Sequence, residues 1–178
     1  MTCIVGIKTT NGLYIGGDSA ISSGNIVQII ADPKIWKTGQ FIIGFAGSLR
    51  VGQIMKYKMK IPPINQRNPT EYMVTGFVDA MRKVLKTAGA ARELNKEEEQ
   101  DNSFLVGFKG HLFEIDGVYG VCEVKDNFTA IGCGSEYALG SLYSSKGTPE
   151  ERIQKALEAS AHFCEGVKPP FDIIKSKR

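Results

Sequence analysis

The first part of the chain consists of short apolar runs separated by turn residues, which is the pattern of β-strands. Asn11-Gly12 lies between two such runs and is the strongest short signal of a β-hairpin. Gly47-Ser48 ends the last run, and the apolar spacing from Leu49 to Met59 then predicts a helix. The predicted strands of this part are 3–9, 13–17, 26–31 and 41–46.

The middle of the chain carries the clearest helix signal. Ile61-Pro62-Pro63 ends the first helix, because proline cannot continue a helical hydrogen-bond ladder. Asn68 is a good N-cap and Pro69 suits the first helical position, so a second helix is predicted up to Gly89. The charged stretch 92–102 is expected to be a solvated helix end or loop. The apolar residues at helical spacing are Met73, Phe77, Met81, Val84 and Ala88.

The last part of the chain predicts strands followed by two further helices. Gly132-Cys133-Gly134-Ser135 marks a strand-to-helix turn before a helix over Tyr137–Tyr143. Thr148 and Glu151 form a capping box that opens the final helix, and Pro169-Pro170 lies beyond its end. The predicted strands are 103–109, 112–115, 118–124, 128–131 and 171–174.

The order of these elements is strands, two helices, strands, two helices and a last strand. Segregated runs of this kind predict an α+β fold or a layered sandwich of sheets with outer helices. A chain of 178 residues, 42% hydrophobic and 23% charged, is expected to form one domain over residues 1–178. A net charge of +3 is too small to predict a nucleic-acid partner, and no apolar stretch approaches a membrane span.

The cysteines and histidines restrict the chemistry further. The four cysteines have no metal-binding spacing, and no secretory signal is visible, so we expect reduced thiols and a cytoplasmic protein. Only His111 and His162 are present, which makes a His-rich metal site or a His-assisted nucleophile improbable. We therefore expect neither a metal nor another cofactor. The familiar hydrolase, P-loop and dinucleotide motifs are missing from the sequence.

Thr2 is the residue with distinctive chemistry. Removal of Met1 would give Thr2 a free α-amine, so that one residue would carry both a nucleophilic hydroxyl and its own base. Such a nucleophile needs a nearby lysine, an acid to hold that lysine and a backbone N–H for the oxyanion. Lys34, Asp18 and Gly47 supply these groups, although each alone is also typical of an ordinary strand-end turn.

Several motifs together resemble one family. Thr2–Gly6, Tyr14–Ser19 and Ile43–Gly47 are similar to the start of a proteasome β-type subunit, including the bacterial HslV-like peptidases. Ile131–Ala138 is similar to the glycine-rich turn that precedes a later helix of that family, and Ala156-Leu157-Glu158 to the start of its penultimate helix. The resemblance covers most of the chain and is weakest between residues 62 and 102.

The resemblance implies an N-terminal nucleophile (Ntn) hydrolase fold, a four-layer αββα sandwich of two antiparallel sheets between helices. It also implies a cytoplasmic threonine-type endopeptidase that cleaves peptides or unfolded proteins. Such subunits assemble into homo-oligomeric rings, hexameric or heptameric and single or stacked, and an ATPase unfoldase is an implied partner. No cofactor follows from the resemblance.

The family's site residues can be carried over by matching position. Thr2 matches the nucleophile, Asp18 and Lys34 match the acid and the amine neighbour at the family's spacing, and Gly47 matches the oxyanion-hole glycine. Where the family usually has a serine near the terminal amine, this chain has Cys133.

Ser135, two residues after Cys133, is the other candidate for that role. The acid and serine that many family members carry after the penultimate helix have no clear match, and Asp172 is predicted as a residue of the last strand. By position, Ile21, Asp32 and Phe45 are expected to line the substrate side-chain pocket. Phe45 would narrow that pocket, and Asp32 would favour a basic side chain.

Two alternatives to the peptidase stay open. The chain can be a non-catalytic ring or scaffold subunit, since Cys133 replaces a serine and a retained Met1 would leave Thr2 without a free amine. It can also be an amidase of the same fold that acts on small amides, for which a monomer or dimer in solution would be the expected state.

Overall fold

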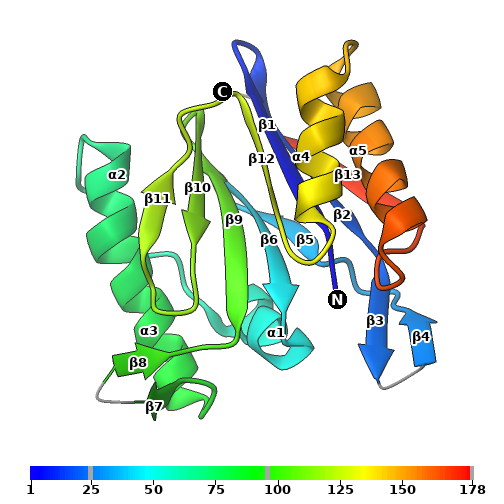
Figure 1. Cartoon of the computed structure of the whole chain (residues 1–178). Coiled ribbons are helices and arrows are strands. Elements are labelled where there is room, and N and C mark those ends of the chain that lie inside the picture. Colours follow the sequence, from blue (N-terminus) through cyan, green and yellow to red (C-terminus); the bar gives the residue numbers. More distant parts are fainter. Residues whose placement is uncertain (24–25, 95–96, 177–178) are drawn as a thin grey trace.

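The computed structural model describes residues 1–23, 26–94 and 97–176. Two antiparallel sheets lie face to face in it (Figure 1). The first sheet has the order β12 (Phe128–Ile131), β1 (Ile4–Thr9), β2 (Gly12–Asp18), β13 (Phe171–Ser176). The second has the order β11 (Val121–Glu123), β10 (His111–Ile115), β9 (Asn102–Phe108), β6 (Phe41–Gly47), β5 (Ile35–Thr38). Two hairpins, β3 (Ala20–Ser23) with β4 (Ile26–Ile29) and β7 (Arg92–Leu94) with β8 (Glu97–Glu99), stand apart from the sheets.

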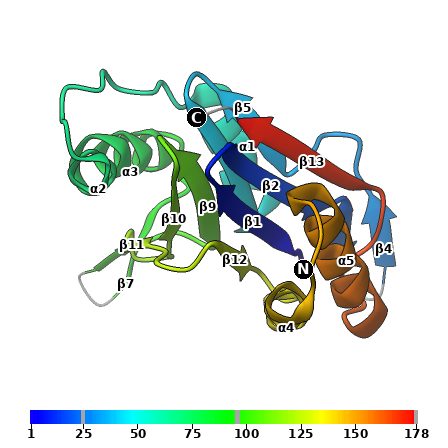
Figure 2. The same ribbon diagram turned by 90° about the horizontal axis from the view of Figure 1, so that it is seen from above.

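Helices cover the outer face of each sheet (Figure 2). α4 (Ser135–Ser144) and α5 (Pro149–Phe163) pack on the first sheet. α1 (Leu49–Lys58) and the helix formed by α2 (Pro69–Tyr72), a π-helical turn η1 (Met73–Phe77) and α3 (Val78–Thr87) pack on the second. The four layers are therefore helix, sheet, sheet and helix, which confirms the predicted α+β sandwich.

The core lies in three layers, because each sheet is buried on both faces. Ile4 and Ile15 of the first sheet meet Ile42 and Leu105 of the second between the sheets. Val5 and its neighbours on the opposite face of β1 pack under α4 and α5. The shared middle layer joins the two sheets.

The second predicted helix contains a feature that its sequence pattern did not reveal. The π-helical turn η1 adds a residue to one turn, so the buried positions repeat every four residues from Met73 to Leu85. Leu85 is fully buried, whereas Val84, which the simple α-helical spacing selected, is only partly buried.

The strand predictions need correction in several places: β3 (Ala20–Ser23) was not predicted, and the strand predicted over 26–31 ends at Ile29. Residues 35–38 form β5, a short strand that the mixed sequence Ile-Trp-Lys-Thr did not reveal. The strand predicted over 118–124 is confined to Val121–Glu123, because the Asp116 carboxylate accepts hydrogen bonds from Val118 N and Gly120 N and closes a turn. The charged stretch 92–102 holds the β7–β8 hairpin, and its residues 95–96 lie outside the described residues.

Among the described residues, no helix is both long enough and apolar enough to cross a membrane.

Candidate active site

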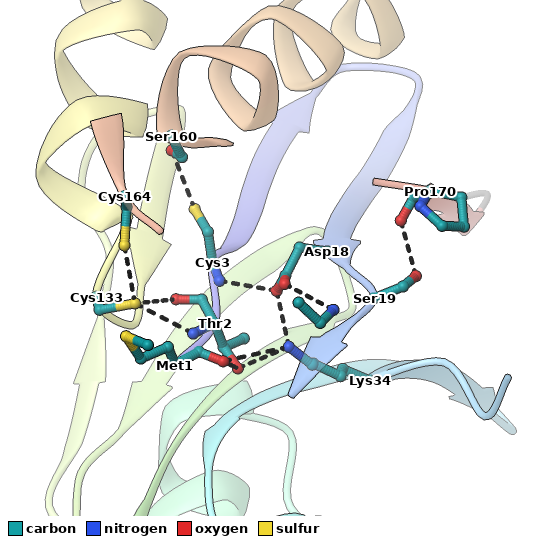
Figure 3. Close-up of polar contacts among 11 residues, drawn as sticks. Met1, Thr2, Cys3, Asp18, Ser19, Lys34, Cys133, Ser160, Cys164 and Pro170 are labelled. Carbon is teal, nitrogen blue, oxygen red and sulfur yellow. Dashed lines mark hydrogen bonds and ion pairs between the residues drawn. The ribbon is translucent and has the colours of Figure 1, made fainter. Parts of the chain in front are cut away.

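Thr2 lies two residues before the start of β1, and the sheet brings two other chain segments to it. β1 is a central strand, with Ile4 opposite Gly17 of β2 on one side and Ile131 of β12 on the other. The end of β2 and the turn after β12 therefore flank Thr2, which is only 2% exposed. Figure 3 shows the polar contacts that meet there.

Asp18 and Lys34 form a buried pair next to the Thr2 hydroxyl. Lys34 Nζ lies 2.8 Å from Thr2 Oγ1 and 2.9 Å from Asp18 Oδ1 (Figure 3). The Asp18 carboxylate also accepts hydrogen bonds from Cys3 N and Ala20 N, both at 3.0 Å. Because Asp18 ends β2 and Lys34 precedes β5, backbone pairing fixes the positions from which both side chains converge.

Burial sets the electrostatics of this pair. Removing the ammonium from water lowers the pKa of Lys34, while the negative charge of Asp18 acts in the opposite direction. A charged Lys34 held in this way donates to Thr2 Oγ1, so it lowers the energy of a developing alkoxide at that oxygen.

Gly47 ends β6 beside Thr2, in a conformation that favours glycine. Its φ angle is +131°, and a β-carbon there would lie 2.3 Å from the carbonyl oxygen of Asp101. Gly47 lines the cavities on both sides of Thr2, so its backbone borders the space where a substrate carbonyl would lie.

Two buried polar residues that the sequence did not single out support this turn. The Asn102 side chain accepts a hydrogen bond from Ser48 N at 2.7 Å and donates one to Ser48 O at 3.0 Å. Gln100 in turn binds both the N–H and the carbonyl of Asn102, at 2.7 and 2.6 Å. Both lie in the charged stretch that was expected to be solvated, which is why pattern reasoning missed them.

Cys133 is the predicted residue that contacts the backbone of Thr2. Thr2 N donates to Cys133 Sγ at 3.2 Å, and Cys133 Sγ lies 3.4 Å from Thr2 O. Burial raises the pKa of the Cys133 thiol. Ser135 instead opens α4 with its N–H bonded to Gly132 O, and within the described part of the chain no hydrogen bond joins it to Thr2.

Gly132 makes this close approach to Thr2 feasible. Its φ angle is +96°, and a β-carbon there would lie 2.2 Å from Thr2 O. The sequence prediction also did not include Cys164, whose Sγ lies 3.3 Å from Cys133 Sγ. Only a three-dimensional contact between the end of α5 and the turn after β12 reveals this pair.

A cavity of about 250 Å³ opens beside Thr2 and includes two of the three predicted pocket residues. Ile21 and Phe45 line it, together with Met1 and Leu49. Asp32 is not among its lining residues, because its carboxylate pairs with Lys56 Nζ and accepts a hydrogen bond from Tyr57 Oη at 3.0 Å. The expected placement of Asp32 in the pocket is therefore corrected.

Met1 occupies the site in the unprocessed chain. Its carbonyl accepts hydrogen bonds from Thr2 Oγ1 and, at 3.4 Å, from Lys34 Nζ. Its side chain packs so closely on Gly166 that a β-carbon there would come within 2.0 Å of Met1 Cβ. Thr2 N is a peptide nitrogen in this state and becomes an amine only when Met1 is lost.

Comparison with known proteins identifies relatives along nearly the whole chain, although no family model matches it. It is 27% identical to the ATP-dependent protease subunit HslV of Caldicellulosiruptor saccharolyticus, over 92% of this chain and 91% of that protein. It is 28% identical to HslV of Campylobacter hominis, over 92% and 89%. It is 27% identical to the proteasome subunit beta of Nanoarchaeum equitans, over 90% and 85%.

Solved structures have the same fold. Thiobacillus denitrificans BPH superposes with a TM-score of 0.81 at 19% identity, over 98% of this chain and 97% of that one. A complex of that protein with epoxomicin matches with a TM-score of 0.80, over 98% of each chain. By sequence the chain is therefore similar to the HslV and proteasome β subunits, and it shares its fold with a solved HslV structure from Trypanosoma brucei.

Proposed function

We propose that the chain is a threonine-type endopeptidase subunit whose nucleophile is Thr2 after the removal of Met1. The contact of Lys34 Nζ with both Thr2 Oγ1 and the buried Asp18 carboxylate carries this proposal, since it activates that one hydroxyl. The relatives described as HslV protease subunits support it.

The reaction proceeds through an ester on Thr2. The Thr2 hydroxyl oxygen attacks the substrate carbonyl carbon, and its proton passes to the α-amine of the same residue. The N–H of Gly47 donates to the oxyanion of the tetrahedral intermediate. The protonated amine then gives its proton to the leaving nitrogen as the peptide bond breaks. Water, deprotonated by the amine, hydrolyses the ester and restores Thr2.

The other residues hold these groups in place. Lys34 stabilises the alkoxide by charge, and Asp18 holds Lys34 while it also fixes the backbone at Cys3. Cys133 takes the place of the family's serine as the partner of the terminal amine, because it is the side chain that contacts Thr2 N. Ser135 contributes to the turn that presents Cys133 rather than to proton transfer.

The cavity beside Thr2 is the proposed pocket for the substrate side chain. Ile21, Phe45 and Leu49 form the apolar part of its lining, which also includes Ser22, Lys34 and Ser48. We infer a preference for side chains with an apolar body that packs against Phe45. The Asp32 carboxylate contacts Lys56 and Tyr57 instead of the pocket, so it gives no reason to expect a preference for basic substrate side chains.

The assembly is proposed from the relatives. A homo-oligomeric ring of six or seven subunits, single or stacked, would restrict access to Thr2 to peptides and unfolded chains. The name of the HslV relatives, ATP-dependent protease subunit, supports an ATPase partner. The four cysteines are free thiols, which supports the cytoplasm as the location.

The decisive test combines intact mass, epoxomicin labelling and peptide hydrolysis on the purified protein. We expect loss of Met1, a covalent adduct at Thr2 and turnover of fluorogenic peptides with an apolar residue before the cut. Thr2→Ala is expected to abolish the adduct and the turnover, and Thr2→Ser to retain part of both. Processed protein with neither adduct nor turnover contradicts the proposal.

A non-catalytic subunit is the second candidate, because Met1 fills the site and bonds to both Thr2 and Lys34. Retention of Met1 in the assembled ring would favour it. Hydrolysis of small amides by a monomer or dimer, without cleavage of peptides, would instead favour the amidase.

A further inference from the structure

Two free thiols meet beside the terminal nitrogen. Cys133 Sγ and Cys164 Sγ are 3.3 Å apart, and Cys133 Sγ is also 3.2 Å from Thr2 N (Figure 3). Cys133 is exposed and Cys164 is partly buried, so small oxidants can reach the pair.

We propose that Cys133 and Cys164 form a reversible disulfide, and that this modification switches off the terminal-amine site. The disulfide itself follows from the geometry of the two thiols, whereas its effect on activity rests on the proposed function.

Closing the bond needs only a small movement. A disulfide has a sulfur–sulfur distance of about 2.05 Å, so the two sulfur atoms must approach by roughly 1.2 Å. Cys133 lies in a turn between Gly132 and Gly134, and Cys164 is the C-cap of α5 with extended backbone angles. Both residues are at element ends, where a shift of this size does not require a helix or strand to move.

The other two cysteines are placed differently and so act as internal references. Cys3 is fully buried, bonds to Ser160 Oγ at 3.4 Å, and has a pKa raised by burial to about 12. Cys122 is exposed on β11, at the far edge of the second sheet. Among the described residues, only Cys133 and Cys164 have thiols within hydrogen-bond distance of each other.

The chemistry balances with a peroxide as the oxidant. The Cys133 thiolate attacks one peroxide oxygen, which gives a sulfenic acid and water. The Cys164 thiol then attacks the sulfenic sulfur, the disulfide forms and a second water leaves. The two thiols lose two electrons and two protons in total, and a dithiol reductant reverses the change. Cys133 is the more exposed of the two thiols, so peroxide reaches it first and it is the attacking group.

The disulfide would change the surroundings of the amine. A disulfide sulfur has no proton to donate to Thr2 O, so the hydrogen bond that holds the Thr2 backbone beside the amine is lost. We therefore expect peptidase activity to fall by about tenfold or more on oxidation, because the amine loses its partner.

The test oxidises the assembled, processed protein with peroxide and then reduces it with a dithiol. Peptide mapping under non-reducing conditions is expected to find a Cys133–Cys164 crosslink, with the loss of two hydrogens from the intact mass. Activity is expected to fall with the crosslink and to return on reduction. Cys164→Ser should stay active and resist peroxide, whereas the matched control Cys122→Ser should remain as sensitive as the wild type.

The outcomes separate this inference from the proposed function. Active protein that forms no crosslink, or that loses activity equally in the Cys164→Ser variant, overturns the inference. A crosslink in a protein that is inactive even when reduced supports the modification site and counts against the peptidase. A crosslink that leaves activity unchanged overturns the switch.

Discussion

Cys3 links the segment between the proposed nucleophile Thr2 and β1 to α5. Its thiol is buried against Ser160, whose hydroxyl also contacts the carbonyls of Gly134 and Ala156 at 2.9 and 2.8 Å. The turn that holds Cys133 therefore rests on a neutral, buried hydrogen-bond cluster directly behind Thr2.

This cluster predicts a loss of stability at high pH. Burial raises the pKa of Cys3 from 9.0 to about 12, so above pH 9 the unfolded thiol ionises while the folded thiol keeps its proton. The folded state then binds more protons, and its stability falls as the pH rises toward 12. Each pH unit costs up to about 1.4 kcal/mol, so roughly 2 kcal/mol is at stake by about pH 10.5.

Urea unfolding at pH 8 and at about pH 10.5 measures this loss. Cys3→Ser keeps a donor to Ser160 but has no group that ionises in this range, so its stability should fall less between the two pH values. Equal losses in the two proteins would rule out Cys3 as the source.

Replacing Asn102 is predicted to slow catalysis, although Asn102 is not proposed to contact the substrate. Its side chain fixes both backbone groups of Ser48, the residue after the proposed oxyanion donor Gly47. In Asn102→Ala the Gly47 N–H loses its fixed direction, so kcat should fall by about tenfold while KM stays nearly constant.

Steady-state kinetics and the rate of epoxomicin labelling check this expectation. The matched control is Asp101→Asn, because Asp101 is the exposed neighbour and its carboxylate pairs with Arg92 on the surface. If KM rises while kcat holds, or if the control loses as much activity, Asn102 does not position the oxyanion donor.

At the scale of single residues, site residues could be predicted where the chemistry of an N-terminal threonine requires particular neighbours. Thr2, Asp18, Lys34 and Gly47 were predicted as one group, and the structure brings them together around one hydroxyl or beside it. Asn102 and Cys164 could not be predicted, because amides and thiols in polar stretches give no signal until their partners are known. Asp32 was wrongly predicted to line the substrate pocket. Its position in the sequence does not reveal that its carboxylate forms an ion pair with Lys56 of α1.

Among the elements, α1 shapes the proposed pocket through Gly52. A β-carbon at Gly52 would lie 2.4–2.5 Å from three atoms of the Phe45 ring, and Phe45 lines the cavity beside Thr2. The glycine thus lets the ring lie flat against the helix and leaves the cavity open.

Gly52→Ala is predicted to alter substrate selection. The displaced Phe45 ring should fill part of the cavity and lower kcat/KM for peptides with a bulky side chain before the cut, by about tenfold. Peptides with a small side chain at that position should be cleaved almost as before. A panel of fluorogenic peptides that differ only in this side chain measures the change.

Gly140→Ala on α4 is the matched control. Nothing lies within 4 Å of a β-carbon at that position, so the change should leave activity intact and add up to about 1 kcal/mol of stability from helix propensity. An unchanged substrate profile in Gly52→Ala would mean that the Phe45 ring relaxes elsewhere.

For the helices and strands, local sequence patterns predicted some features and missed others. Helix starts were predictable at Asn68 and Thr148, where cap residues satisfy free N–H groups and the structure has these bonds. The π-helical turn and β5 were not, because the turn depends on packing against the second sheet and β5 on pairing with β6 rather than on local preference.

For the whole molecule, the hydrophobic pattern predicted the class and the resemblance predicted the layers. Strand order was beyond the pattern, because β1 pairs with β12 and β2 with β13, strands far away along the chain. A period-two pattern states that a strand is buried and says nothing about its neighbour. The site depends on this pairing, since it places the turn with Cys133 next to Thr2.

That pairing also has a consequence for the timing of synthesis. Thr2 leaves the ribosome well before the thiol that contacts its nitrogen, which is 131 positions later in the chain. The β12 edge of β1 and the cluster around Ser160 are likewise missing until the last third has emerged. A nascent chain therefore carries the proposed nucleophile Thr2 without a working centre, and translation itself delays activity until β12 and α5 have been made.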